Sequence, residues 1–74
     1  MKDYNEKDVK FVRDMIPHHE SAKKMAADVY HNGKNEEIKK LAQEIYHAQD
    51  AEIKKMKKWL KDRGLPEISS AMKM

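Results

Sequence analysis

The sequence predicts an all-α fold, an antiparallel hairpin of two long helices, from three observations. Apolar residues recur at helical spacing along two stretches, residues 6–31 and 36–63. Only two glycines and two prolines interrupt the 74 residues. The segment between the stretches is short enough to be a tight turn. We therefore expect a single domain over 1–74, with helices over about 6–31 and 36–63 and a short C-terminal tail over 64–74.

Residue types that cap helices stand at the ends of both stretches. Asparagine side chains accept hydrogen bonds from the first turn of a helix, and glycine commonly ends one. These positions are Asn5 and Gly33 for the first stretch, and Asn35 and Gly64 for the second. Pro17 lies inside the first stretch, where proline removes a backbone hydrogen bond. We expect it to bend or briefly break the helix on its solvent side.

Each predicted helix carries an apolar stripe that is wider than one neighbouring helix can cover. The first stripe consists of Phe11, Val12, Met15, His18, His19, Ala22, Met25, Ala26, Val29 and Tyr30. The second consists of Ile38, Leu41, Ala42, Ile45, Ala48, Gln49, Glu52, Ile53, Met56, Trp59 and Leu60. In a lone hairpin each helix hides only the side that faces its mate. We therefore expect two hairpins to pair into a four-helix bundle, as a homodimer or a higher homo-oligomer.

The composition excludes several classes of site and partner. There is no cysteine, which excludes disulfides and thiolate metal sites. Sixteen basic and thirteen acidic residues give a formal net charge of +3. Because the two signs are interleaved, they predict solvated helix surfaces and no binding of nucleic acid. A chain of this size is near the limit for a stable single core, so we expect a metal or a partner subunit to support it.

The sequence leaves the cellular location open. It contains no apolar run of the roughly 20 residues that a membrane span needs, and no signal peptide opens it. We expect either a cytoplasmic protein, or one that is periplasmic or extracellular after removal of a signal peptide.

A combination of histidines and methionines on the first stripe suggests a metal site. Met15, His18, His19 and Met25 alternate with alanines that leave room beside the imidazoles. Imidazole binds several transition metals, whereas a thioether selects Cu(I) or Ag(I) over zinc or magnesium. Met15 lies three and four residues before the two histidines, so it shares a helix face with them. Met56, on the core face of the second helix, could complete the site.

Core packing is the alternative interpretation of these residues. Methionine commonly fills gaps in apolar cores, and the histidines could pack at a structural or pH-dependent interface. A di-iron enzyme is a further alternative, since Glu44 and His47 match the Glu-x-x-His motif of such bundles. We expect His47, and also His31, to point to solvent. Met72 and Met74 in the tail could add a flexible hook for a soft metal.

Two blocks of the sequence carry a specific pattern. They are FVRDMIPHHESAKKMA (11–26) and LAQEIYHAQDAEIKKMKKWL (41–60). The first contains Met-Ile-Pro-His-His and then Met-Ala, and the second contains Gln-x-x-Glu-Ile followed by Met and Trp-Leu. In this pattern the chain resembles the bacterial domain-of-unknown-function 305 family.

The resemblance implies a ferritin-like helical bundle and an association with copper in the exported space of bacteria. It implies metal ligands at Met15, His18, His19, Met25 and Met56. Gln49 and Glu52 also match the pattern, and we expect them to orient the histidines or to satisfy buried hydrogen bonds. The expected function is therefore non-enzymatic, namely the sequestration or trafficking of copper as Cu(I), or of silver.

Overall fold

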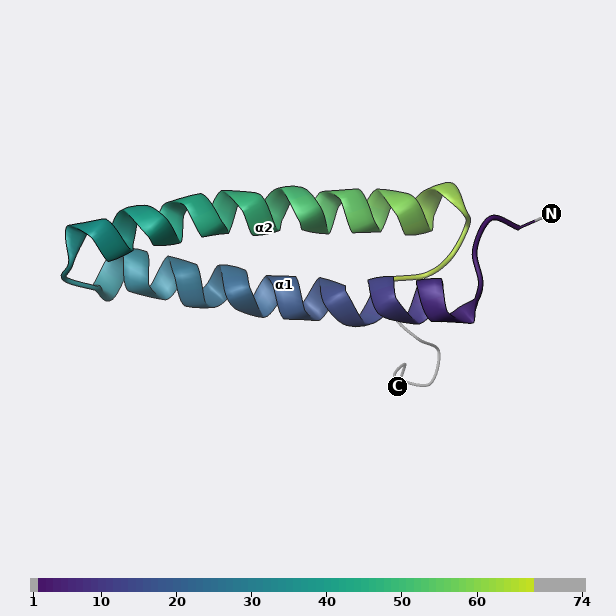
Figure 1. The fold of residues 1–74 in the computed structure, drawn as a ribbon, viewed down its shortest axis with the longest axis horizontal. Coiled ribbons are helices and arrows are strands. Elements are labelled where there is room, and N and C mark those ends of the chain that lie inside the picture. Colours follow the sequence, from purple (N-terminus) through teal and green to yellow (C-terminus); the bar gives the residue numbers. More distant parts are fainter. Residues whose placement is uncertain (1, 68–74) are drawn as a thin grey trace.

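The fold is an antiparallel hairpin of two helices, as the sequence predicts. The computed structural model describes residues 2–67. Helix α1 spans Glu6–Asn32 and helix α2 spans Glu36–Asp62, and the two lie against each other along their whole length (Figure 1). The C-terminal end of each helix lies one residue from its expected position, which was residue 31 for α1 and residue 63 for α2. Within residues 2–67 there is no strand, and the predicted all-α class is confirmed.

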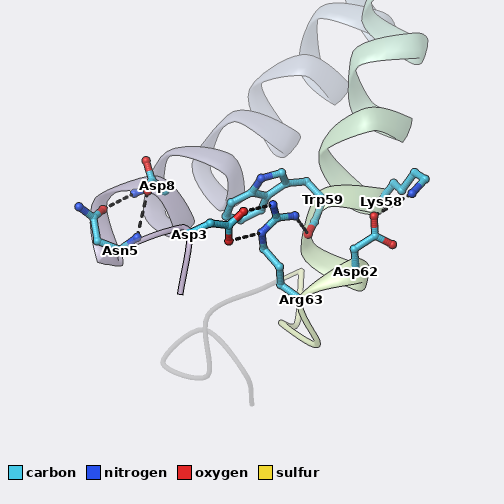
Figure 2. Close-up of polar contacts among 7 residues, drawn as sticks. All are labelled: Asp3, Asn5, Asp8, Lys58, Trp59, Asp62 and Arg63. Carbon is cyan, nitrogen blue, oxygen red and sulfur yellow. Dashed lines mark hydrogen bonds and ion pairs between the residues drawn. The ribbon is translucent and has the colours of Figure 1, made fainter. Parts of the chain in front are cut away.

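Asparagine caps the start of each helix. The Asn5 side chain accepts a hydrogen bond from the backbone N–H of Asp8, and the Asp8 carboxylate accepts one from the backbone N–H of Asn5 (Figure 2). This reciprocal pair satisfies two N–H groups that the first helical turn leaves without partners. Asn35 accepts from Ile38 in the same way at the start of α2. The local sequence at these two points therefore sets where the helices begin.

The two glycines end their helices in different ways. Gly64 adopts the left-handed conformation (φ 67°), and the N–H of Leu65 donates to the carbonyl of Leu60 at 2.9 Å, as in a Schellman motif. Gly33 instead has an extended backbone, with φ −77° and ψ 172°. A Cβ atom on Gly33 would lie 2.4 Å from the carbonyl oxygen of Val29. Glycine is thus required at position 33 by close approach, and at position 64 by backbone conformation.

Pro17 does not interrupt α1. The helix runs through it from Glu6 to Asn32, and the proline is exposed on the solvent side, as the helical wheel predicts. Within residues 2–67, neither helix combines the length and the hydropathy that crossing a membrane requires.

The buried core of the hairpin is small. Only five hydrophobic residues of the described chain are buried, and they are Ile16, Ala26, Ala42, Ile53 and Leu60. Much of each predicted stripe stays exposed, including Phe11 (62%), Met25 (73%), Ile38 (48%), Leu41 (49%) and Ile45 (38%). The expectation that a lone hairpin cannot cover two wide stripes is therefore confirmed.

Arg63 ties the N-terminal segment to the end of α2. Its guanidinium donates to both carboxylate oxygens of Asp3, at 3.2 and 2.6 Å, and to the carbonyl oxygen of Trp59 at 3.1 Å (Figure 2). It also lies 4.2 Å from the Trp59 ring centroid, where a cation–π contact is favourable. The hydrogen bonds from Arg63 lower the pKa of the Asp3 carboxyl. The open end of the hairpin is thus held by contacts that helical periodicity does not predict.

Candidate metal site

The predicted ligands lie on one side of α1 and on the adjoining part of α2, at different depths. Met15, His19 and Met56 are half-buried, whereas His18 and Met25 are exposed. Tail residues Met72 and Met74 lie outside the described residues.

His19 is the most constrained of the predicted ligands. Its side chain is 14% exposed. Nδ1 lies 2.9 Å from the carbonyl oxygen of Met15, one helical turn earlier. Nε2 lies 2.5 Å from a carboxylate oxygen of Glu52 on α2. The ring is therefore held by one contact within its own helix and by one contact between the helices.

The partners of the two nitrogens define the state of the ring. A carbonyl oxygen only accepts hydrogen bonds, so Nδ1 of His19 carries a proton and donates a hydrogen bond to the carbonyl oxygen of Met15. An ionised Glu52 is also only an acceptor, so both nitrogens donate when His19 is an imidazolium. When His19 is neutral with its proton on Nδ1, the lone pair on Nε2 is free to bind a metal. A hydrogen bond from Nδ1 to a backbone carbonyl is the common way of fixing a metal-binding histidine in that tautomer.

Glu52 therefore both orients His19 and competes for its nitrogen. Its side chain is 59% exposed and can swing into solvent. The expectation that Glu52 contacts the histidines is confirmed for His19.

The His19–Glu52 contact also sets the register between the helices. In an antiparallel pair, moving four residues back along α1 and four residues forward along α2 reaches the same level of the hairpin. That level holds Met15 and Met56. Both are half-buried and one turn from the His19 ring. By this register, Met15 and Met56 lie about one helical turn from His19, whereas His18 is exposed on α1.

Met25 lies apart from this group. Ten residues separate it from Met15, which corresponds to about 15 Å along a helix axis. It stands instead on an apolar groove. We call this groove the apolar face, and its residues are Ala22, Met25, Ala26, Val29, Ile38, Leu41, Ala42 and Ile45. The five predicted ligands therefore do not converge on a single ion within one chain.

Charged groups gather on the other side of the hairpin, which we call the charged face. Its residues are Glu20, Lys23, Asp50, Lys54 and Lys57. Asp50 accepts from Lys23 at 2.9 Å and pairs with Lys54 at 3.1 Å. The hydrogen bond between them lowers the pKa of the Asp50 carboxyl and raises the pKa of the Lys23 ammonium. On this side, ion pairs therefore join the two helices.

The remaining histidines lie elsewhere. His31 and His47 are exposed, as expected, and line a groove near the turn together with Tyr30 and Tyr46. Lys23 lies 4.9 Å from the centroid of the Tyr46 ring, so this groove adjoins the charged face. Within residues 2–67 no three side chains drawn from histidine, cysteine, aspartate and glutamate cluster closely enough to hold a metal.

The family match covers nearly all of these elements. The profile of the family described as "Domain of unknown function (DUF305)" matches residues 8–74. The chain belongs to that family. The matched range of the DUF305 family includes both helices from Asp8 onward, and with them all five predicted ligands. Comparison with curated proteins and with solved structures gave no significant match.

The separation of Met25 is the feature that sequence reasoning missed. Its signal was present, because a spacing of ten residues already implies too long a distance for a shared ion. Helical phase alone placed Met25 with the other ligands, since residues can share a face of a helix and still lie several turns apart.

Proposed function

We propose that this protein binds a soft monovalent ion, Cu(I) or Ag(I), through Met15, His18, His19 and Met56. The ion would be a cargo that is sequestered or passed on, and the role is binding without catalysis. Within a single chain, Met25 takes no part in this group of donors.

The orientation of His19 is the observation that carries the proposal. Nδ1 is fixed on the Met15 carbonyl at 2.9 Å, so an ion would bind Nε2, in place of the contact that this nitrogen makes with Glu52. That nitrogen points across to α2, one turn from the level of Met15 and Met56.

The donor types favour a soft ion. Two thioethers and two imidazoles suit Cu(I) or Ag(I), and they offer little to magnesium or calcium, which prefer oxygen ligands. Methionine is also flexible, with three rotatable bonds, so Met15 and Met56 can adjust to an ion without movement of the helices.

An anaerobic titration with Cu(I) against a coloured chelator tests this function. The native chain is compared with a double variant, His18→Ala plus His19→Ala. We expect the double variant to bind Cu(I) at least about 100-fold more weakly, because it loses both imidazoles. Circular dichroism would first establish that the variant keeps its helices.

The chain offers a matched control. His31→Ala plus His47→Ala also removes two imidazoles, but from the groove beside the charged face. This control should leave the affinity for Cu(I) unchanged. A native chain that cannot compete with even a weak chelator would contradict the proposal, and His18 and His19 would then be packing or interface residues. A titration with Ag(I), which does not change oxidation state under these conditions, gives an independent measure of the same site.

A further inference from the structure

We propose that a second copy of this chain covers the apolar face, with its turn at the opposite end, and that the partner's Met25 completes the ion site of Met15 and His18. This inference rests on the proposed function and extends it. It predicts that each ion is held between two chains, and that a dimer contains two such sites related by its two-fold axis.

The apolar face exposes large apolar side chains that a second chain could bury. Met25 is 73% exposed, and Leu41 and Ile45 beside it are 49% and 38% exposed. Each helix has 27 residues and is about 40 Å long. Two adjacent helices present a face about 20 Å wide, so a second hairpin laid along it would cover about 800 Å² on each partner. That area matches a standard stable interface, and a second copy is an occupant with the right length.

The spacing along α1 sets how the second copy lies. The residues of α1 on this side of the hairpin are Phe11, Met15, His18, Ala22, Met25 and Val29, which are half-buried or exposed. Their spacing of four, three, four, three, four reads the same in both directions, with its centre at position 20. A two-fold axis at this point runs α1 against the partner's α1 in the opposite direction. Met15 then lies across from the partner's Met25, and His18 across from the partner's Ala22.

This pairing leaves space where the ion is expected. Alanine is the smallest side chain of the set, so the partner's Ala22 leaves room beside the His18 ring. The partner's Met25 brings a third thioether to the level of Met15 and Met56. The shared site also explains why a methionine remains exposed at position 25, about 15 Å along the helix axis from Met15 of its own chain.

The two possible orientations of the second copy bring different helices together. Because α1 and α2 are antiparallel, the proposed axis crosses α2 near position 51, close to its middle, and α1 packs against the partner's α1. With both turns at the same end, a two-fold axis parallel to the helices would instead place α1 against the partner's α2. The two orientations can therefore be distinguished by which positions face each other.

Cysteine cross-linking tests the orientation without any metal. The chain has no cysteine, so single substitutions react only at the chosen positions. A mixture of Phe11→Cys and Val29→Cys chains should form the mixed disulfide under mild oxidation, because these positions face each other across the proposed axis. A mixture of Val29→Cys and Leu41→Cys chains should not. Preferential cross-linking of the second mixture would overturn the proposal, since it would place the two turns at the same end.

Mixing two defective chains tests whether the site is shared. Met15→Leu and Met25→Leu each remove one thioether and keep an apolar side chain of similar size. Each variant alone should bind Cu(I) at least about tenfold more weakly than the native chain. Refolded together, they should recover native affinity at about a quarter of the native number of sites, because half of the dimers are mixed and each holds one intact site.

The outcomes separate this inference from the proposed function. If native affinity is not recovered in the mixture, the sites lie within single chains and the shared site is wrong, although Cu(I) binding stands. If Met25→Leu binds as tightly as the native chain, the partner's Met25 is a packing residue and the inference is likewise wrong. If the native chain fails to bind Cu(I), the proposed function fails, and cross-linking still reports how the chains pair.

Discussion

The apolar face and the charged face are built from the same two helices, on either side of one small core. On the charged face, Lys23 and Lys57 of different helices form pairs with Asp50 and Glu20. On the apolar face, Met25 and Leu41 have no charged neighbours in the groove and remain largely exposed. On one side of the hairpin, charged side chains thus pair with each other within the chain, and on the other side apolar side chains remain exposed. A stripe that is wider than its neighbouring helix can cover is therefore a signal of an additional binding surface.

The energies on the two faces also differ. Half-buried surface ion pairs such as Lys23–Asp50 contribute little to stability, because water screens them and the side chains lose freedom. A leucine side chain that becomes fully buried contributes about 1.5–3 kcal/mol. The apolar face thus holds most of the free energy that an assembly could still gain.

Introducing a charged side chain on the apolar face should have the largest effect, a loss of self-association. We expect Leu41→Asp to weaken self-association at least about 100-fold, because two leucines per dimer lose their burial and two carboxylates must be desolvated. Sedimentation velocity over a range of concentrations measures this change. Gln43→Asp is the matched control, since position 43 lies on the same helix but lines the groove near the turn on the opposite side. Equal self-association of the two variants would show that the apolar face is not the interface.

A smaller effect is expected at the contact between His19 and Glu52. Glu52→Gln removes the carboxylate that lies 2.5 Å from Nε2 and competes with an ion for that nitrogen. We expect the affinity for Cu(I) to rise by about fivefold, which is modest because Glu52 is well exposed and a charged hydrogen bond is weakened by water. The chelator competition assay measures it. A lower affinity in Glu52→Gln would contradict this prediction, because it would mean that the carboxylate favours ion binding more than it competes for Nε2.

The smallest effect is expected on the charged face. Hydrogen bonds from Lys23 and Lys54 lower the pKa of Asp50 below its usual 3.8 in the folded chain. A carboxyl whose pKa is depressed by folding stabilises the fold above its unfolded pKa, and this contribution is lost as pH falls through the folded value. Asp50→Asn should therefore lower Tm by about 2 °C at pH 7 and should have no effect below the folded pKa. Thermal melts between pH 7 and pH 2 should show the Tm values of the native chain and the variant converging at low pH. A difference in Tm that stays constant with pH would contradict the prediction.

Most of the fold could be predicted from the sequence because its local signals agree. Asn5 and Asn35 cap the helices at the expected residues, and the helix ends fall within one residue of expectation. The wide stripes correctly implied exposed apolar surface. The conformation of Gly33 was not predictable in this way, since close approach to the Val29 carbonyl depends on how the chain leaves the helix.

The candidate site could be predicted only in part. Spacing of three and four residues places Met15, His18 and His19 within one turn of α1, because these distances are local to one helix. The register between the helices is not local, so the expectation that Gln49 and Glu52 orient the histidines did not specify that Glu52 contacts His19. The clamp of Arg63 on Asp3 joins residues 60 positions apart and has no periodic signal at all.

Sedimentation equilibrium with and without one equivalent of Ag(I) per chain would show whether the ion and the second copy use the same face. An ion that is held between two chains must stabilise the dimer, because it binds the dimer more tightly than the monomer. We predict that Ag(I) strengthens dimerisation by about 100-fold or more in the native chain, and much less in the Met25→Leu variant. Stoichiometric binding of Ag(I) with no change in the dimerisation constant would contradict the shared site.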